Sequence, residues 1–234
     1  MRIAVVVLAA GSGTRFGHST NKVWLPLGER RIISHSLLNA VESFPNCRTV
    51  LVIDPVDAVT ARDVLAEEVP QIHVELVNGG PTRHDSEFSA LRYLSTLILD
   101  GSIDVVLIHD GARPLATSDL FHSVALAAHK YGGALPAIDV DPLEMDIVTG
   151  DRIARVQTPQ AFRAKEVFSA YSQAEIDKFV GTDTAACMEK YFPETESIAV
   201  PGEITNIKIT YPYDLVIAEK IIAGRKNGGR SVQE

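Results

Sequence analysis

From Val5 to Lys22 the chain reads V-V-V-L-A-A-G-S-G-T-R-F-G-H-S-T-N-K, and this stretch points to both a fold and a binding site. The apolar run Ile3–Ala10 ends in a small-residue loop, Ala9–Gly13. Small residues let a ligand approach the backbone closely, and successive backbone N–H groups form an anion-binding nest. Arg15 and Lys22 add mobile positive charge beside this loop. A buried strand, a close-approach loop and two cations together predict a polyphosphate site.

Two better-known phosphate-binding loops do not match this stretch. The dinucleotide fingerprint G-x-G-x-x-G needs a glycine where the chain has Phe16. The P-loop needs G-K-S or G-K-T, whereas Gly17 is followed by His18. The alternative interpretation is a tight strand-to-loop turn with an incidental arginine. The presence of two cations just after the loop disfavours it.

The composition is typical of a globular protein in a reducing compartment. With 234 residues and 46% hydrophobic content, the chain can bury the core of one large domain. Its net charge of −8 argues against a general nucleic-acid binder, which would be basic. Cys47 and Cys187 form neither a metal-ligand spacing nor a disulfide framework. There is no signal-peptide pattern and no apolar segment near the ~18 residues of a membrane span. We therefore expect a cytoplasmic protein with no membrane partner.

Short apolar strands alternate with helical patterns along the first half of the chain. The expected strands are Ile3–Ala9, Thr49–Ile53, Val74–Val77 and Val105–His109. Four helices are expected. The first begins near Ile32, and the others cover residues 56–69, 85–99 and 117–131. Strands continuous in Val, Ile and Leu are typical of a sheet covered on both faces. The order predicts an α/β fold with three layers and a mostly parallel sheet.

Ligands of such sheets bind at the carboxyl ends of the strands, so the loops after the strands form the candidate site. Residues 78–86 read N-G-G-P-T-R-H-D-S, in which two glycines admit a flat ligand and Ser86 is a candidate to hydrogen-bond a base edge. Residues 109–114 read H-D-G-A-R-P. Asp110 and Arg113 suit a metal, a ribose hydroxyl or a phosphate, and an ion pair that braces the loop is the alternative. We expect His109 to have a structural role.

The second half of the chain has fewer regular patterns. Residues 134–138 form an expected strand, and Gly181–Ala186 is typical of a capped helix start. Glu203–Thr210 has a strand pattern with Lys208 embedded in it. A lysine in a strand is usually solvated, so Lys208 taken alone is weak evidence for a functional site. The charged, glycine-rich tail from Gly224 onward is expected to fray.

Six motifs in order carry a resemblance to a known family. They are L-A-A-G-S-G-T-R with Lys22, G-G-x-x-R-x-D-S at 79–86, H-D-G-A-R-P at 109–114, T-P-Q-A-F at 158–162, T-D at 182–183 and N-I-K-I-T at 206–210. The set resembles the 2-C-methyl-D-erythritol 4-phosphate cytidylyltransferase family. The resemblance implies a single Rossmann-like nucleotidyltransferase domain over 1–224, with a projecting β-arm at about 136–158 and a tail at 225–234. It also implies a homodimer.

The reaction implied by this resemblance joins CTP to a sugar-alcohol phosphate and releases pyrophosphate, with Mg²⁺. The acceptor phosphate attacks the α-phosphorus of CTP in line, so the protein's tasks are positioning and charge neutralisation. Because the nucleophile is already an anion, no general base is required.

The same resemblance implies a role for each candidate residue. The expected catalytic cations are Arg15, Lys22 and Lys208. The nucleotide is expected to be bound by Leu8, Ala9, Ala10, Gly11, Gly13, Gly79, Gly80, Asp85, Ser86 and Gly111. The acceptor is expected to be bound by Asp110, Arg113, Thr182 and Lys208. Asp110 is also the candidate metal ligand, the alternative being that the CTP phosphates hold the metal.

The chain departs from the family pattern at a few positions, most of them in the arm. Asn21 precedes the lysine where the family usually has proline. Val140 and Gly150 stand where a threonine and an arginine are expected, with Arg152 and Arg155 out of register. The arm is also several residues short.

These departures leave the acceptor open, because the family's contacts to its second substrate lie in the arm. Methylerythritol phosphate is favoured over ribitol 5-phosphate or another pentitol phosphate. The ending E-I-T-N-I-K-I-T-Y-P-Y-D-L, residues 203–215, also resembles the ribitol 5-phosphate cytidylyltransferases. A non-catalytic nucleotide-binding homologue is the third interpretation, which the joint presence of Arg15, Lys22, Asp110 and Lys208 disfavours.

Overall fold

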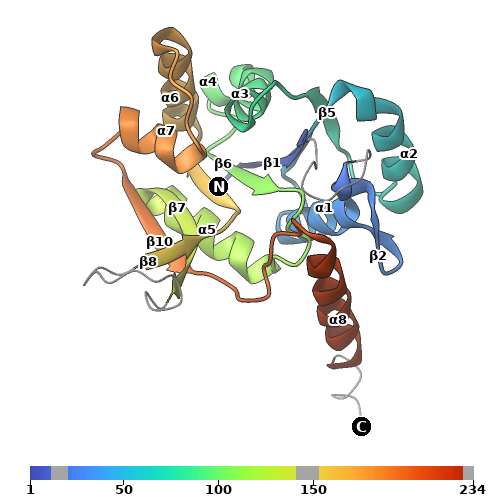
Figure 1. The fold of residues 1–234 in the computed structure, drawn as a ribbon. Coiled ribbons are helices and arrows are strands. Elements are labelled where there is room, and N and C mark those ends of the chain that lie inside the picture. Colours follow the sequence, from blue (N-terminus) through green and yellow to red (C-terminus); the bar gives the residue numbers. More distant parts are fainter. Residues whose placement is uncertain (12–20, 141–152, 229–234) are drawn as a thin grey trace.

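A computed structural model describes residues 1–11, 21–140 and 153–228 of the chain (Figure 1). Of the candidate residues, Gly13 and Arg15 lie outside the described residues, as do Gly150 and Arg152 in the arm. The architecture is a mixed, mostly parallel sheet with helices on both faces, which confirms the predicted three-layer α/β fold.

The main sheet has eight strands and runs in the order β10-β7-β9-β6-β1-β4-β5, with β8 paired to β7. Their bounds are β1 (Ile3–Ala9), β4 (Arg48–Ile53), β5 (Glu75–Asn78), β6 (Val105–Asp110), β7 (Gly132–Val140), β8 (Ile153–Val156), β9 (Gln160–Arg163) and β10 (Glu196–Pro201). The pairs β1–β4, β1–β6, β4–β5 and β7–β10 are parallel, whereas β9 and β8 pair antiparallel to their neighbours. A separate small ribbon pairs β2 (Pro26–Leu27) with β3 (Arg30–Arg31).

The helices divide between the two faces of the sheet (Figure 1). One face is covered by α1 (Ile32–Ser43), α2 (Ala58–Glu68) and α5 (Ser118–Tyr131). The other is covered by α3 (Arg83–Tyr93), α4 (Ser95–Leu99), α6 (Ala164–Asp177) and α7 (Thr184–Tyr191). The last helix, α8 (Pro212–Gly228), extends away from the sheet in Figure 1. Within the described ranges, no helix has the length and apolarity needed to cross a bilayer.

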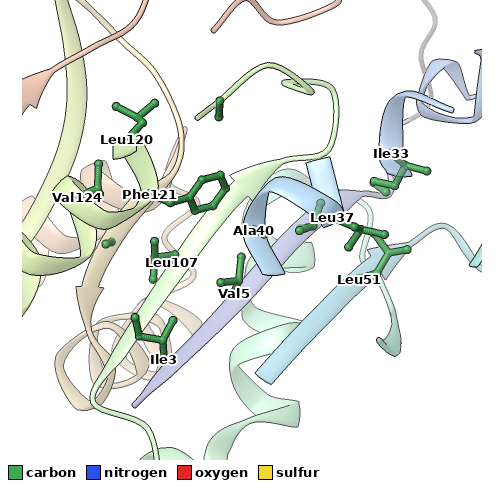
Figure 2. Close-up of a cluster of buried hydrophobic side chains, with 14 of the residues drawn as sticks. Ile3, Val5, Ile33, Leu37, Ala40, Leu51, Leu107, Leu120, Phe121 and Val124 are labelled. Atoms are coloured by element: carbon green, nitrogen blue, oxygen red, sulfur yellow. The ribbon is translucent and has the colours of Figure 1, made fainter. Parts of the chain in front are cut away.

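The alternation of side chains along β1 explains why the apolar N-terminal run decides the fold. Ile3 and Val5 face the α1 and α5 side, where Figure 2 shows them with Leu107 and Phe121. Ala4 and Val6 belong to the cluster on the opposite face. Successive strand residues point to opposite faces, so a strand buried on both sides must be apolar at every position.

Two expected elements differ from the structure at their boundaries. The expected helix 85–99 is two helices, α3 and α4, and it begins earlier because Thr82 and Asp85 form a capping box ahead of α3. The expected frayed tail was wrong in part, because α8 continues through Gly228. Its apolar residues pack with Leu27 and Leu115 in a third core cluster.

The predicted strand at Glu203–Thr210 is wrong. The preceding strand, β10, ends at Pro201, and residues 206–210 have no regular secondary structure. The backbone of this segment bonds to loops instead of to a ladder, as when Ile209 N donates to Ala112 O at 2.8 Å. Below, residues 203–210 are called the Lys208 segment.

Candidate active site

A cleft of about 490 Å³ opens where the carboxyl ends of β1, β5 and β6 meet. Strands β4 and β5 lie on one side of β1 and β6 lies on the other, so this is the point at which the strand order reverses. The volume is that of a small-molecule site. Its lining includes Leu8, Ala9, Ala10, Gly11, Asn21, Lys22, Gly80, Arg83, Ser86, Asp110 and Lys208. The cleft therefore brings together two predicted cations and most of the predicted nucleotide loop.

Asp110, at the end of β6, is surrounded by three cations. Its carboxylate contacts Lys208 Nζ at 2.7 Å and Arg113 Nε at 3.8 Å. Arg83 Nη1 forms a third, short contact with it. Burial alone would raise the pKa of the Asp110 carboxyl, but the positive charges of Arg83 and Lys208 outweigh burial and hold the pKa well below its ordinary value. Asp110 is therefore a permanent anion that organises cations at the cleft.

Arg83 links this cluster to a buried carboxyl beneath it. Its Nε donates to Glu87 Oε1 at 2.9 Å, one turn along α3. Glu87 is fully buried and also accepts hydrogen bonds from the hydroxyls of Tyr171 and Thr184. Burial raises the pKa of Glu87. No role was predicted for Arg83 or Glu87, although their i, i+4 spacing after the glycine pair was a signal for an ion pair.

The loops after β1 and β5 pack so closely that glycine is required between them. A Cβ on Gly79 would lie 2.5 Å from Ala10 Cβ, and one on Gly80 would lie 2.3 Å from Asp85 Cβ. Gly80 N donates to Ser86 Oγ at 3.1 Å, so this hydroxyl closes the loop on itself. Asp85 accepts a hydrogen bond from Thr82 N at 3.0 Å. In this structure Gly79 and Asp85 shape the loop from behind, while Gly80 and Ser86 line the cleft.

Gly111 holds the loops after β1 and β6 together. Its N–H donates to Leu8 O at 2.9 Å, and a Cβ there would lie 2.7 Å from Ile33 Cδ1. Among the described residues, the neighbouring Ala112 lines the cleft and Gly111 does not. Gly111 thus brings the nucleotide loop within reach of Asp110.

The Lys208 segment is held in place by buried amide side chains. Gln157 Nε2 donates to Glu203 O at 2.8 Å, and Gln157 Oε1 accepts from Glu203 N at 3.1 Å. Asn206 Nδ2 donates to Thr158 O at 2.9 Å. These bonds fasten the segment to the T-P-Q-A-F motif and so place Lys208 beside Asp110. Asn206 belongs to the N-I-K-I-T motif and Gln157 directly precedes T-P-Q-A-F, but no role was predicted for either residue.

The other two residues predicted to bind the acceptor substrate, Arg113 and Thr182, do not line the cleft. Arg113 is largely buried, and its Nη1 donates to Asn206 O at 2.7 Å. Thr182 is exposed just before α7. The adjacent Asp183 caps α7 through Ala186 N at 2.9 Å and accepts from Gln160 Nε2 at 2.9 Å, which ties α7 to β9.

His109 has the structural role expected of it. It is fully buried, with Nε2 3.1 Å from Arg113 O and Nδ1 3.2 Å from Thr158 Oγ1. A carbonyl oxygen only accepts, so the bond to Arg113 O assigns a proton to Nε2. Burial lowers the pKa of His109 to about 4. The alternative proposed for Asp110 and Arg113, a loop-bracing ion pair, is also observed, as one part of the cation cluster.

The chain matches the model of the 2-C-methyl-D-erythritol 4-phosphate cytidylyltransferase family over residues 3–224. It belongs to this family. The cytidylyltransferase of that name from Bacillus velezensis is 36% identical over 233 residues, covering 95% of this chain and 96% of the relative. The one from Geobacillus kaustophilus is 35% identical over 234 residues, covering 96% and 99%.

Solved structures with titles of the same family have the same fold. The 4-diphosphocytidyl-2C-methyl-D-erythritol synthase of Anaerococcus prevotii superposes with a TM-score of 0.77 at 26% identity, covering 95% of this chain and 96% of that one. The 2-C-methyl-D-erythritol 4-phosphate cytidylyltransferase of Thermus thermophilus gives 0.68 at 27% identity, covering 94% and 98%. Family membership and fold therefore agree with the motifs that line the cleft.

Asp110 is the predicted metal ligand at this cleft. Among the described residues, no group of three or more His, Cys, Asp or Glu side chains is placed to hold a metal ion. The Asp110 carboxylate already faces Arg83, Arg113 and Lys208, whose charges would repel a divalent cation. Of the two predicted alternatives for the metal, this arrangement favours the one in which the nucleotide phosphates hold it.

Proposed function

We propose that this family member transfers the cytidylyl group of CTP to 2-C-methyl-D-erythritol 4-phosphate, forming CDP-methylerythritol and pyrophosphate. The observation that carries the proposal is that Lys22 and Lys208, from opposite ends of the chain, line one cleft together with the loop after β1. The Bacillus and Geobacillus relatives are named for this acceptor, which supports methylerythritol phosphate over a pentitol phosphate.

The nucleotide is assigned to the side of the cleft formed by the loops after β1 and β5. Residues Leu8–Gly11 offer small side chains and backbone N–H groups to the triphosphate, and Lys22 adds a cation beside them. Gly80 and Ser86 lie where a flat base would approach the backbone. By the family resemblance, Gly13 and Arg15 are also assigned to the nucleotide. Gly79, Asp85 and Gly111 hold the loops of this side in place.

The acceptor phosphate is assigned to the side formed by Asp110 and the Lys208 segment. Arg83, Arg113 and Lys208 all face Asp110, and Arg83 also pairs with Glu87. Three cations face at most two negative charges, so the cluster keeps positive charge for an incoming phosphate. Lys208 is the most exposed of the three, with 38% of its side chain accessible, and lines the cleft. By resemblance, Arg113 and Thr182 also serve the acceptor.

The chemistry is a single in-line displacement. A phosphate oxygen of the acceptor bonds to the α-phosphorus of CTP while the bond from that phosphorus to the bridging oxygen breaks, and its electron pair leaves with pyrophosphate. No proton must be removed from the nucleophile. Lys22 and Lys208 hold the two anions together and offset the charge that develops on the α-phosphoryl oxygens.

Mg²⁺ is proposed to enter as a complex with the triphosphate of CTP, because Asp110 is already paired with cations. We further propose a homodimer, supported by the antiparallel β7–β8 pair, in which β8 lies off the main strand order and Val156 is 44% exposed. A cytoplasmic location is supported by the two free cysteines and by substrates that are both phosphorylated.

The test is pyrophosphate release from CTP and Mg²⁺ with each alcohol phosphate offered separately. Methylerythritol phosphate should give turnover, and ribitol 5-phosphate should give at most a small fraction of it. Preferential turnover of ribitol 5-phosphate would replace the acceptor in the proposal. No release with any acceptor would leave a nucleotide-binding homologue. Light scattering of the same sample measures whether it is dimeric.

A further inference from the structure

The turn that carries Lys22 is too short to hold its own shape. It is η2 (Lys22–Trp24), a single turn of 3₁₀ helix between the glycine-rich loop and β2. One end is anchored by Val23 and Trp24, which are 3% and 5% exposed and belong to the core beneath α1. Such a turn gains little from its own hydrogen bonds, so side-chain anchors at both ends must set its position.

Asn21 anchors the other end through three side-chain hydrogen bonds. Nδ2 donates to Ala9 O at 2.5 Å and to Asp57 Oδ2 at 3.3 Å, while Oδ1 accepts from Val23 N at 3.3 Å. Asn21 is 8% exposed, and these bonds use both donors and one acceptor of its amide. They join the turn to the end of β1 and to the residue that precedes α2.

We propose that Asn21 is a positioning residue for Lys22, and that its amide fixes the angle at which the lysine enters the cleft. The inference rests on the proposed function, because it takes Lys22 to act on the nucleotide. Its geometric basis is that both neighbours of Lys22 are buried and anchored, whereas Lys22 itself is half-buried and lines the cleft. A displacement of the turn therefore displaces the lysine side chain as well.

The three partners require an amide and exclude a carboxylate of the same shape. Ala9 O and Asp57 Oδ2 are both acceptors, so the group facing them must donate. In Asn21→Asp the cap on Val23 N would survive, but two acceptors would face a carboxylate oxygen with no hydrogen between them. This variant removes the two donated bonds without changing the size of the side chain.

The test is a double-mutant cycle on pyrophosphate release, measured at high enzyme concentration so that weak variants are quantified. Asn21→Ala should lower kcat between about tenfold and a hundredfold, the effect of a small misplacement of a catalytic group. The KM for CTP should change less than about threefold. In the Lys22→Ala background the same change should lower kcat less than about twofold, because no lysine remains to be misplaced. Asn21→Asp should behave like Asn21→Ala in both backgrounds.

Asp100→Ala is the matched control. Asp100 accepts from Ser102 N at 2.8 Å, the same two-residue spacing as Asn21 and Val23, but on the loop after α4. It should leave kcat unchanged. An equal loss of kcat from Asn21→Ala or Asn21→Asp with and without Lys22, or a wild-type kcat in both variants, would overturn the inference. Absence of turnover in the wild type would instead overturn the proposed function. If Asn21→Ala does not fold, the kcat of the isosteric Asn21→Asp with and without Lys22 tests the inference.

Discussion

The two lysines that line the cleft are held by different kinds of support. Lys22 comes from a turn just after the first strand, with Val23 and Trp24 buried in the core behind it. Lys208 comes from a segment without regular secondary structure, fastened by Gln157 and Asn206 across 46 and 48 residues of sequence. One side of the cleft is therefore fixed by apolar packing together with the single amide of Asn21, which bonds Ala9 and Asp57. The other side is fixed by hydrogen bonds of buried amides to residues 46 and 48 positions away. We therefore expect substitutions on the two sides to change different kinetic constants.

The largest effect should come from Lys22→Ala. If Lys22 offsets charge in the transition state, kcat should fall by about 10²- to 10³-fold, the usual consequence of losing one such donor. The KM for the acceptor should change little, since the acceptor is assigned to the other side. Steady-state kinetics with both substrates varied measures this split. Lys220→Ala, which removes an exposed lysine of α8, is the control. A near-wild-type kcat in Lys22→Ala would refute the role of Lys22.

Lys208→Ala should act mainly on the acceptor. Loss of a charged hydrogen bond to a phosphate corresponds to about 1.5–3 kcal/mol, so the KM for the acceptor should rise between about tenfold and a hundredfold. The KM for CTP should stay near the wild-type value. Lys208→Arg keeps the charge beside Asp110 and should recover part of the loss. A change confined to the KM for CTP would reverse the assignment of the two sides.

Asn206→Ala tests whether buried amides hold the acceptor side. It removes the bond to Thr158 O and leaves that carbonyl without this donor, so the free energy of unfolding should fall by about 1–3 kcal/mol. The KM for the acceptor should rise severalfold because Lys208 loses its support. Urea unfolding and kinetics measure the two effects. Asn39→Ala removes a comparable bond to Pro114 O, and it should lower stability without affecting this KM. An unchanged acceptor KM in Asn206→Ala would show that the segment is held elsewhere.

The smallest expected effect is a pH dependence of stability from His109. The folded protein lowers the pKa of His109 from 6.5 to about 4, so below pH 6.5 the unfolded chain binds a proton that the folded protein does not. Stability from this residue is complete above pH 6.5 and is lost as the pH falls toward 4, at about 1.4 kcal/mol per pH unit.

The comparison with His109→Gln isolates this contribution. Glu87, whose pKa is raised, works in the opposite direction, but it is present in both proteins and cancels in the difference. Urea unfolding at pH 7 and pH 5 should show a steeper loss of stability in the wild type than in His109→Gln. Equal losses would show that His109 does not resist protonation. Because His109 bonds Arg113 O and Thr158, acid should weaken the acceptor side first.

The nucleotide side of the cleft was predicted better from the sequence than the acceptor side. The strands that flank the nucleotide side were predicted within about one residue, because burial on both faces makes them continuously apolar. The loops after these strands were identified as the site because ligands bind at the carboxyl ends of parallel strands. An ion pair of Asp110 with Arg113 was one of the two interpretations, but Arg83 comes from the start of α3, and no local pattern links it to Asp110.

The acceptor side was predicted poorly because its contacts are long-range. The Lys208 segment has the apolar and polar alternation of a strand, yet its backbone is satisfied by Ala112 O and by Gln157. Nothing in the local pattern reveals a glutamine 46 residues earlier that bonds both backbone groups of Glu203. Likewise, α8 continues beyond Gly224 because of its contacts with other segments, as when Arg225 donates to Leu115 O at 3.0 Å.

The most direct test of the central claim is to follow labelled phosphate from CTP through one turnover with methylerythritol phosphate. Label at the α-position should appear in a CDP-alcohol, and label at the γ-position should appear in pyrophosphate. That outcome would place the attack at the α-phosphorus, between the sides that carry Lys22 and Lys208. Release of γ-label as inorganic phosphate, or α-label that stays in CTP or CMP whatever the acceptor, would contradict the proposed transfer.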